Sequence, residues 1–249
     1  MNRLALEINQ LSYSYSDGTL AIKNISFSVI EGEKLMIIGP NGAGKSTLLL
    51  HLNGLLRGKG EIKIYGEPVI KKNLKKIRTR VGLVFQNPDD QLFMPSVLDD
   101  VAFGLFYRLT AREEIEVKVR KILKDLGIEH LAGKSQPELS LGEKKKVSLA
   151  TVLVLEPEIL VLDEPTSGLD PGSRRWLINY LKKTSRTLVV ATHDLNFAWE
   201  IGQRMIIMDR GEIIAIGRRE EILGNKDLLE QHNLEIPLLY LLEKIGVRS

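Results

Sequence analysis

The feature that most constrains this chain is the glycine-rich block Gly39–Thr47, GPNGAGKST. A mostly apolar run, Lys34–Ile38, precedes it, and a helical pattern over Thr47–Leu55 follows it. Glycines at a junction from strand to helix let backbone N–H groups surround a phosphate, while a lysine and a hydroxyl reach the outer phosphates and Mg²⁺. The block therefore predicts a nucleotide site on an α/β sheet. The expected phosphate-binding residues are Gly39, Pro40, Asn41, Gly42, Ala43, Gly44, Lys45, Ser46 and Thr47, with Ser46 also a Mg²⁺ ligand.

Two acidic residues end another apolar strand. The run Ile159–Leu162 delivers Asp163 and Glu164 to the carboxyl end of that strand, where ligands bind in parallel sheets. We expect Asp163 to hold Mg²⁺ indirectly, from behind its direct ligands, and Glu164 to polarise the attacking water. Lys45 is expected to serve the same reaction, because it reaches the β- and γ-phosphates.

Two further polar residues follow apolar strands. His193 comes directly after Leu188–Thr192 and is positioned to hydrogen-bond the γ-phosphate. Gln86 ends the strand Val81–Phe85 and is a candidate for contact with Mg²⁺ or the water. The remaining histidines, His51, His130 and His232, are expected to be structural.

Composition excludes several classes of protein. There is no cysteine among the 249 residues, which rules out disulfides and thiolate sites. The net charge of +3, from 35 basic and 32 acidic residues, predicts no nucleic-acid partner. The residues Met1–Glu7 do not resemble a secretory signal, and no apolar run is long enough for a membrane helix. We therefore expect membrane association, if any, to go through a partner.

Hydrophobic periodicity divides the chain into strands and helices. Alternating residues predict strands near Leu4–Ile8, Ile22–Val29 and Ile62–Gly66. The period becomes helical after Ser96, where Ser96 with Asp99, and Thr110 with Glu113, have capping-box spacing. Residues from about 88 to 142 thus form a predicted helical insertion. The later elements are helix 143–155, strand 159–163, helix 172–183, strand 187–192, helix 195–202 and a hairpin of 205–208 with 213–216.

Taken in order, these blocks resemble the ATP-binding subunits of ABC transporters over residues 4 to 217. The most specific element is Leu139–Glu143, LSLGE, which precedes Asp163; Leu141 and Glu143 stand where the family has glycine and glutamine. The resemblance implies an α/β phosphate-loop NTPase with a three-layer core, a mainly parallel sheet, an N-terminal antiparallel β subdomain and an inserted helical subdomain. It also implies an ATPase domain at 1–217 and a C-terminal helical extension at 218–249.

The same resemblance assigns roles to single residues. Two subunits would pack head to tail, so that Ser140 and Gly142 of each contact the ATP of the other. Tyr15 would stack on adenine, with Tyr13 as the rival. Gln86 would be the Q-loop residue and His193 the switch histidine; the D-loop would be Ser167–Asp170.

Within that family, Phe85–Phe93 is similar to the energy-coupling-factor importers for vitamins, cobalt or nickel. That similarity implies ATP and Mg²⁺, a second ATPase subunit, identical or homologous, an integral membrane scaffold and a substrate-binding membrane subunit. The chain would then lie at the cytoplasmic face of the cell membrane. Asp89, Asp90 and Gln91 would line the groove for a scaffold helix, although a polar helix cap after Pro88 is the alternative.

Other possibilities stay open at this point. A soluble regulatory or DNA-repair ATPase of the same superfamily would carry long heptad insertions or tandem halves, and a small-molecule kinase would not need Leu139–Glu143. Lys144–Lys146 are expected to be a solvated helix start. The apolar stripe after residue 235, interrupted by Pro237, could pair subunits or fold onto its own domain.

Overall fold

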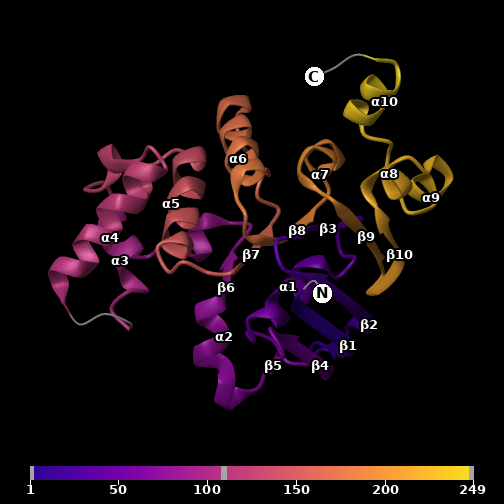
Figure 1. Ribbon diagram of the computed structural model, residues 1–249, viewed down its shortest axis with the longest axis horizontal. Helices are drawn as coiled ribbons and strands as arrows, with labels where there is room; N and C mark the ends of the chain where they lie inside the picture. Colours follow the sequence, from indigo (N-terminus) through magenta and orange to yellow (C-terminus); the bar gives the residue numbers. More distant parts are fainter. Residues whose placement is uncertain (1–2, 108–110, 247–249) are drawn as a thin grey trace.

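The computed structural model describes residues 3–107 and 111–246 and contains two sheets (Figure 1). In the larger sheet the strand order is β10-β9-β3-β8-β7-β6, with parallel pairing from β9 to β6 and an antiparallel edge strand, β10. This confirms the predicted α/β fold with a mainly parallel sheet. Its strands are β3 (Lys34–Ile38), β6 (Val81–Val84), β7 (Ile159–Asp163), β8 (Thr187–Thr192), β9 (Arg204–Asp209) and β10 (Glu212–Arg218).

The five parallel strands of this sheet are buried on both faces, so they are mostly apolar rather than alternating with polar residues, whereas the edge strand β10 is exposed or half-buried along its length. Along β3, Met36 and Ile38 pack into one hydrophobic cluster, whereas Leu35 and Ile37 pack into another. The first cluster joins the sheet to the helices above it and to the helical lobe. The second joins it to α1 (Lys45–Leu52) and the smaller sheet.

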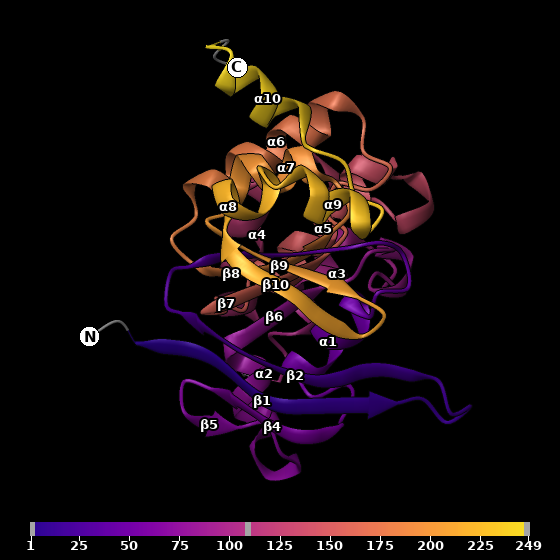
Figure 2. The same cartoon turned by 90° about the vertical axis from the view of Figure 1, so that its right-hand side faces the viewer.

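The smaller sheet is antiparallel, with the order β2-β1-β4-β5. Figure 2 shows its long strands beneath the rest of the molecule. This is the predicted N-terminal β subdomain, and it supplies Tyr13 and Tyr15 to the region beside the glycine-rich block. Its strands are β1 (Leu4–Ser14), β2 (Leu20–Ile30), β4 (Lys59–Ile64) and β5 (Glu67–Pro68).

The helical lobe lies to one side of the larger sheet (Figure 1). Ser96 caps its first α-helix: the hydroxyl accepts from the Asp99 amide at 3.2 Å, which confirms that capping prediction. Thr110 lies outside the described residues, and α4 has Ala111 at its N-cap. The lobe contains η2 (Pro88–Asp90), α3 (Val97–Phe103), α4 (Arg112–Asp125), η3 (Glu129–Leu131), η4 (Gln136–Glu138) and α5 (Leu141–Leu153).

The other helices are α2 (Leu74–Arg80), after the 3-10 turn η1 (Lys71–Asn73), and those of the C-terminal half: α6 (Pro171–Lys183), α7 (Leu195–Ile201), α8 (Arg219–Leu223), α9 (Lys226–Gln231) and α10 (Leu238–Lys244). None of the helices in the described ranges has the length and apolarity to cross a membrane.

The last segment folds partly onto its own domain. Pro237 is the N-cap of α10, and Tyr240 is buried edge-to-face against Trp199, whose indole N–H donates to Glu243 at 3.1 Å. On the opposite side of α10, Leu238 and Ile245 are exposed, and no residue in the described part of the chain covers them. The apolar stripe therefore divides between an inner and an outer face.

Candidate nucleotide-binding site

The glycine-rich block forms a tight loop between β3 and α1. A side chain at Gly39 would place its Cβ 2.0 Å from the Met208 carbonyl oxygen, and one at Gly44 would approach the Ala21 carbonyl oxygen to 2.5 Å. Both positions also have positive φ, so the close approach and the backbone conformation each require glycine there. A Cβ at Gly42 would meet nothing within 4 Å, because this part of the loop opens into a cavity.

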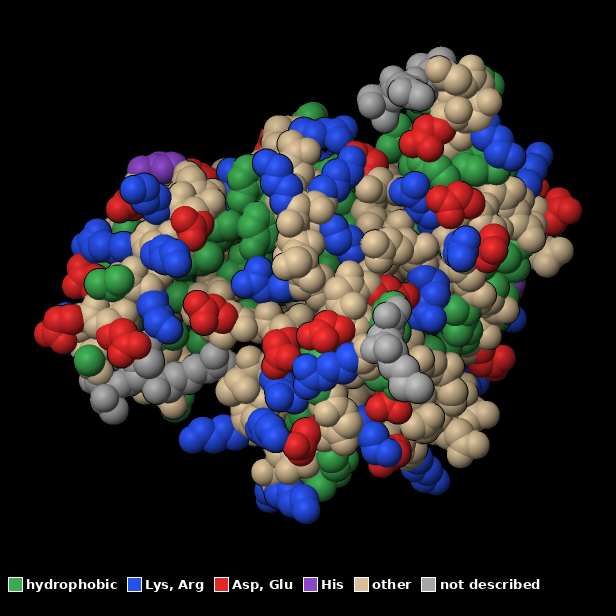
Figure 3. All heavy atoms as spheres, in the orientation of Figure 1, with side chains coloured by type: hydrophobic (Ala, Val, Ile, Leu, Met, Phe, Trp, Pro, Cys, Tyr) green, Lys and Arg blue, Asp and Glu red, His purple; other side chains and the backbone are tan. Residues whose placement is uncertain are grey.

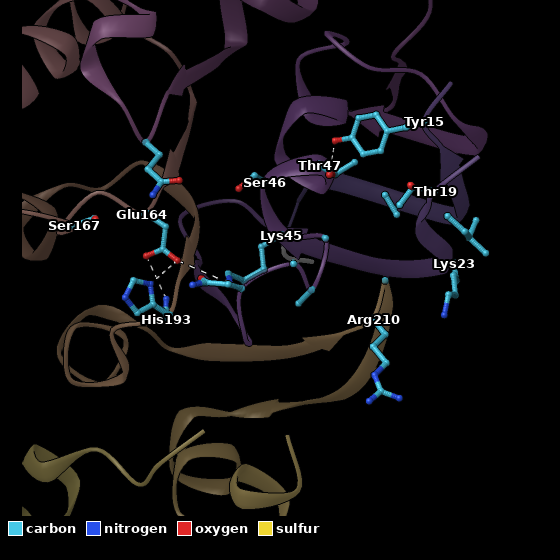
Figure 4. Close-up of a pocket in the computed structure, with 18 residues that line it drawn as sticks. Tyr15, Thr19, Lys23, Lys45, Ser46, Thr47, Glu164, Ser167, His193 and Arg210 are labelled. Atoms are coloured by element: carbon cyan, nitrogen blue, oxygen red, sulfur yellow. Dashed lines mark hydrogen bonds and ion pairs between the residues drawn. The ribbon is translucent and has the colours of Figure 1, made fainter. Parts of the chain in front are cut away.

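That cavity has a volume of about 700 Å³ and brings together most of the predicted nucleotide residues (Figure 4). Gly39 and Pro40 do not line it, but their carbonyl oxygens accept hydrogen bonds from Lys45, which does. The expected residues that line it are Tyr15, Asn41, Gly42, Ala43, Gly44, Lys45, Ser46, Thr47, Gln86, Glu164 and His193.

Lys45 is buried and positioned by the loop itself. Its ammonium donates to the Gly39 oxygen at 2.7 Å and to the Pro40 oxygen at 3.0 Å, and lies 3.9 Å from Oε1 of Glu164. Burial lowers the pKa of Lys45, whereas the carboxylates of Glu164 and Asp163 raise it. These two carbonyl oxygens accept the hydrogen bonds that the Lys45 ammonium could instead donate to phosphate oxygens.

Both the backbone and the carboxylate of Glu164 have hydrogen-bond or ion-pair partners. Its backbone has φ of 41°, a strained value for a residue with a side chain, and its N–H donates to the Ala191 carbonyl. Oε1 lies 2.9 Å from Nδ1 of His193, and Oε2 accepts from the Thr192 hydroxyl at 3.2 Å and from the His193 amide at 3.3 Å. Glu164 is only 5% exposed, and these partners fix the direction of its carboxylate.

Asp163 and Ser46 form the candidate Mg²⁺ position. Burial raises the pKa of Asp163, and a hydrogen bond with the Ser46 side chain opposes that rise. Oδ1 of Asp163 is buried with no hydrogen-bond partner in the described part of the chain. Residues 3–107 and 111–246 contain no cluster of three or more His, Cys, Asp or Glu able to hold a metal. One carboxylate and one hydroxyl fit Mg²⁺, which takes its other ligands from phosphates and water.

The two candidate adenine residues occupy different environments. Tyr15 is 40% exposed, lines the cavity, and its hydroxyl lies 2.8 Å from that of Thr47. Tyr13 packs edge-to-face against Tyr15 and against the buried ring of His51. The geometry favours Tyr15 for the stacking role, which remains a prediction.

Sequence reasoning missed several wall residues on the tyrosine side of the cavity. Figure 4 shows the side chains of Lys23 and Arg210 there, from β2 and from the β9–β10 turn. The only sequence signal was the Asp209–Gly211 turn, which indicates a hairpin and says nothing about a ligand. Gly211 anchors this turn, because its N–H donates to the Ala43 carbonyl of the glycine-rich loop. The missed lining residues are Thr19, Leu20, Ala21, Lys23, Arg210 and Gly211, and the cavity is also lined by Ser167 of the predicted D-loop.

Ser140 and Gly142 do not line this cavity. Ser140 is the N-cap of α5: its hydroxyl and amide both lie 2.8 Å from the Glu143 carboxylate, in a capping box. Gly142 packs against α6, where a Cβ would come within 2.3 Å of the Ser173 hydroxyl. The helix therefore starts at Leu141, two residues before the predicted start, because Ser140 and Glu143 cap it.

The three lysines that follow are not a solvated helix start, contrary to expectation. Lys144 forms an ion pair of 2.8 Å with Asp89, and the Lys146 ammonium lies 4.7 Å from the centre of the Trp176 ring. Lys145 donates to the Glu164 carbonyl at 3.0 Å and to the Pro165 carbonyl at 3.3 Å. A run of like charges looks solvated in sequence because its partners come from distant segments.

The predicted docking residues after β6 are also engaged within the chain. Asp89 accepts from Gln136 at 2.7 Å as well as pairing with Lys144. Gln91 points inward, and its amide donates at 2.7 Å to both the Ser148 carbonyl and the Thr151 hydroxyl of α5. Asp90 is exposed. Docking of a scaffold helix here remains a prediction, with Asp90 as its most accessible acid.

The chain is similar to known proteins in sequence. The family model described as ABC transporter matches residues 22–167. An energy-coupling factor transporter ATP-binding protein, EcfA, from Carboxydothermus hydrogenoformans is 44% identical over 240 residues, which cover 95% of this chain and 88% of that protein.

Two solved structures extend the comparison to the fold. The structure of cbiO1 from Clostridium perfringens, part of the ABC transporter complex cbiONQ, has a TM-score of 0.80 at 38% identity and covers 97% of this chain and 99% of that one. A dimeric post-hydrolysis state of the ATP-binding cassette MJ0796, bound to ADP and Pi, has a TM-score of 0.77 at 29% identity, covering 86% and 98%.

Proposed function

Because this chain belongs to the ATP-binding subunits of ABC transporters, we propose that it binds ATP between two such subunits and hydrolyses it to drive an importer of the energy-coupling-factor type. The observation that carries this proposal is the separation of two candidate phosphate-binding elements in one chain. The glycine-rich loop opens into a cavity, whereas Ser140 caps α5 outside that cavity. A second ATPase subunit, identical or homologous, is needed to bring the two kinds of element together.

The helix that starts at Ser140 suits this role. α5 has 13 residues, so its N-terminal N–H groups and dipole favour a negatively charged group. Ser140 is exposed and Leu141 is 41% exposed, so this end is accessible to another protomer. The cassette MJ0796 is dimeric in its post-hydrolysis state with ADP and Pi, which supports a dimer of ATPase subunits for this chain.

Hydrolysis would use the residues around Glu164. The Glu164 carboxylate takes a proton from water as the water oxygen attacks the γ-phosphorus and the bond to the β-phosphate oxygen breaks. Lys45 exchanges the Gly39 and Pro40 carbonyl oxygens for phosphate oxygens, and His193 holds Oε1 of Glu164. Ser46 and Asp163 would hold Mg²⁺, with Gln86 as the third candidate. When bound, Mg²⁺ neutralises charge on the phosphate oxygens.

The names of two relatives support a set of partner proteins for this chain. EcfA is named as the ATP-binding protein of an energy-coupling factor transporter, and cbiO1 as part of a complex, cbiONQ. By analogy, this chain would join a second ATPase subunit, a membrane scaffold and a substrate-binding membrane subunit at the cytoplasmic face of the membrane. The cargo would be a vitamin or a metal ion such as cobalt or nickel.

The exposed side of α10 offers a second contact between subunits. Leu238 is 60% exposed and Ile245 is 73% exposed, whereas the other side of the helix is fixed to α7 by Trp199. Apolar side chains this exposed favour a covering partner. We therefore favour subunit pairing for the outer face of the extension.

The test is affinity purification of the tagged chain from detergent-solubilised membranes of cells that co-express the membrane proteins encoded beside it. We expect recovery of an integral membrane protein, and release of free phosphate from ATP by the complex. Asp90→Lys should reduce that recovery, whereas Asp227→Lys, an exposed acid of α9, should not. Recovery of DNA without membrane protein would favour a repair or regulatory ATPase. Transfer of phosphate to a metabolite would indicate a kinase.

A further inference from the structure

Lys145 connects the helix of Ser140 to the strand end that carries the proposed catalytic base. It lies in the second turn of α5, and its ammonium donates to the carbonyl oxygens of Glu164 and Pro165 at 3.0 and 3.3 Å. Burial lowers the pKa of Lys145 to about 8, and the carboxylates of Glu164 and Asp163 oppose the shift. The partly buried Lys145 ammonium therefore donates its hydrogen bonds to two backbone oxygens.

The first of those oxygens belongs to a strained part of the backbone. Glu164 has φ of 41°, a backbone conformation that a residue with a Cβ adopts only when its surroundings hold it there. The Ala191 carbonyl accepts from the Glu164 N–H, and the Glu164 carbonyl accepts from the Lys145 ammonium and, at 3.2 Å, from the Ser167 N–H. Because the backbone conformation sets the direction of the side chain, Lys145 contributes to aiming the Glu164 carboxylate.

The N-terminal end of α5 packs against α6 and the segment that precedes it. Gly142 packs against Ser173 at the start of α6, and a Cβ at Gly168 would lie 2.7 Å from the Leu141 side chain. Figure 1 shows α5 beside α6, and Figure 3 shows hydrophobic side chains in the furrow between them. A displacement of α5 would therefore be transmitted to the segment after Glu164.

We infer that Lys145 is a positioning residue for ATP hydrolysis: it makes α5 part of the catalytic geometry of its own chain, while Ser140 at the tip of α5 serves the nucleotide of the partner chain. This inference rests on the proposed function, because it takes Glu164 as the base and Ser140 as acting across the dimer. Each α5 thus serves both sites, through two residues five positions apart in its sequence.

Single variants test the positioning. Lys145→Met keeps the side-chain length and removes the donor, and should lower kcat by about ten- to a hundredfold with little change in KM, because misaimed groups cost rate rather than binding. Lys145→Arg should restore much of kcat. The matched control is Lys146→Met, which removes a neighbouring lysine from the face of Trp176 and should leave kcat unchanged. Equal kcat in Lys145→Met and the native chain would overturn the inference.

Mixed dimers separate this role from a purely structural role of α5. In a large excess of Glu164→Gln chains, the only working glutamates belong to the minor chain. Lys145→Met on the minor chain should lower kcat, because that chain carries the working Glu164. Lys145→Met on the excess chain, which supplies only Ser140, should not. Loss of rate in the second arrangement alone would overturn the inference in favour of a structural role. If the native chain itself releases no phosphate from ATP, the proposed function fails instead.

Discussion

Nδ1 of His193 lies 2.9 Å from Oε1 of Glu164, and the backbone N–H of the same histidine donates to Oε2 at 3.3 Å. One residue at the end of β8 therefore contacts both oxygens of a carboxylate at the end of β7. The two strands are parallel neighbours, and Asp163 is paired with Ala191, so the sheet itself brings these side chains together. Lys45 approaches the same carboxylate from the glycine-rich loop.

Glu164→Gln is predicted to remove most of the hydrolysis. The amide keeps the shape and can still bond to Thr192 and His193, but it cannot take a proton from water, so the rate should fall by about 10²- to 10⁴-fold. ATP affinity should be unchanged. Phosphate release and equilibrium ATP binding measure the two effects, and normal turnover by this variant would remove Glu164 from the role of base.

His193→Ala is predicted to lower kcat more than ATP affinity. The imidazole holds one carboxylate oxygen, and its loss frees Glu164 to turn, for which we expect about a hundredfold lower kcat. The control is His130→Ala, which removes an exposed histidine of the helical lobe. Equal loss in both variants would show a nonspecific effect and contradict the assignment.

Lys45→Ala is predicted to weaken ATP binding, since the variant loses the charged donor of the phosphate loop. A charged hydrogen bond is worth about 1.5 to 3 kcal/mol, which corresponds to a loss of affinity of about ten- to a hundredfold. Lys72→Ala, an exposed lysine, is the comparison. Titration calorimetry with ATP and Mg²⁺ measures both, and unchanged affinity of Lys45→Ala would refute the phosphate assignment.

His51 is predicted to make stability dependent on pH. It is 1% exposed, its Nδ1 lies 2.7 Å from the Thr47 carbonyl, and Nε2 has no partner within the described ranges. The neutral ring donates from Nδ1, so a second proton would go to a buried nitrogen that lacks an acceptor. Burial accordingly lowers the pKa of His51.

The lowered pKa of His51 sets the direction in which stability changes with pH. The unfolded chain binds the proton at about pH 6.5 and the folded chain only at lower pH, so the free energy of unfolding should fall as pH drops below about 6.5. His51→Gln keeps a donor and does not titrate. The difference in unfolding free energy between the native chain and this variant, from denaturant titrations, should be constant above pH 7 and change below it. A difference that stays constant down to pH 5 would contradict the argument.

Most of the strand ends could be predicted from sequence, because an apolar run followed by a polar residue is a local pattern. Glu164, His193 and Gln86 were found this way, and all three line the cavity. The backbone strain at Glu164 leaves no such trace. Its φ of 41° depends on partners from β8 and α5 that are distant in sequence.

The residues that were missed depend on long-range contacts. Lys23 and Arg210 reach the cavity because the β9–β10 turn is bonded to the glycine-rich loop, which no local pattern encodes. Lys145 looked like one of three solvated lysines for the same reason. The predicted start of α5 was two residues late, because the capping box of Ser140 and Glu143 starts the helix before its apolar pattern begins.

The central claim is that each ATP site is shared between two chains, and a mixing experiment tests it most directly. Ser140→Arg blocks the tip of α5 and leaves Glu164 intact, whereas Glu164→Gln does the reverse. Each variant alone should be inactive. Mixed in equal amounts, they should regain about a quarter of the native rate of phosphate release, because half of the dimers then contain one complete site of the two.

Mixing Glu164→Gln with Lys45→Ala is the control, since both changes affect the same side of the site and no complete site can form. Recovery with Ser140→Arg but not with Lys45→Ala is the predicted result. A mixture with Ser140→Arg that stays inactive while mixed dimers are present, or a Ser140→Arg chain that hydrolyses ATP normally by itself, would contradict the account.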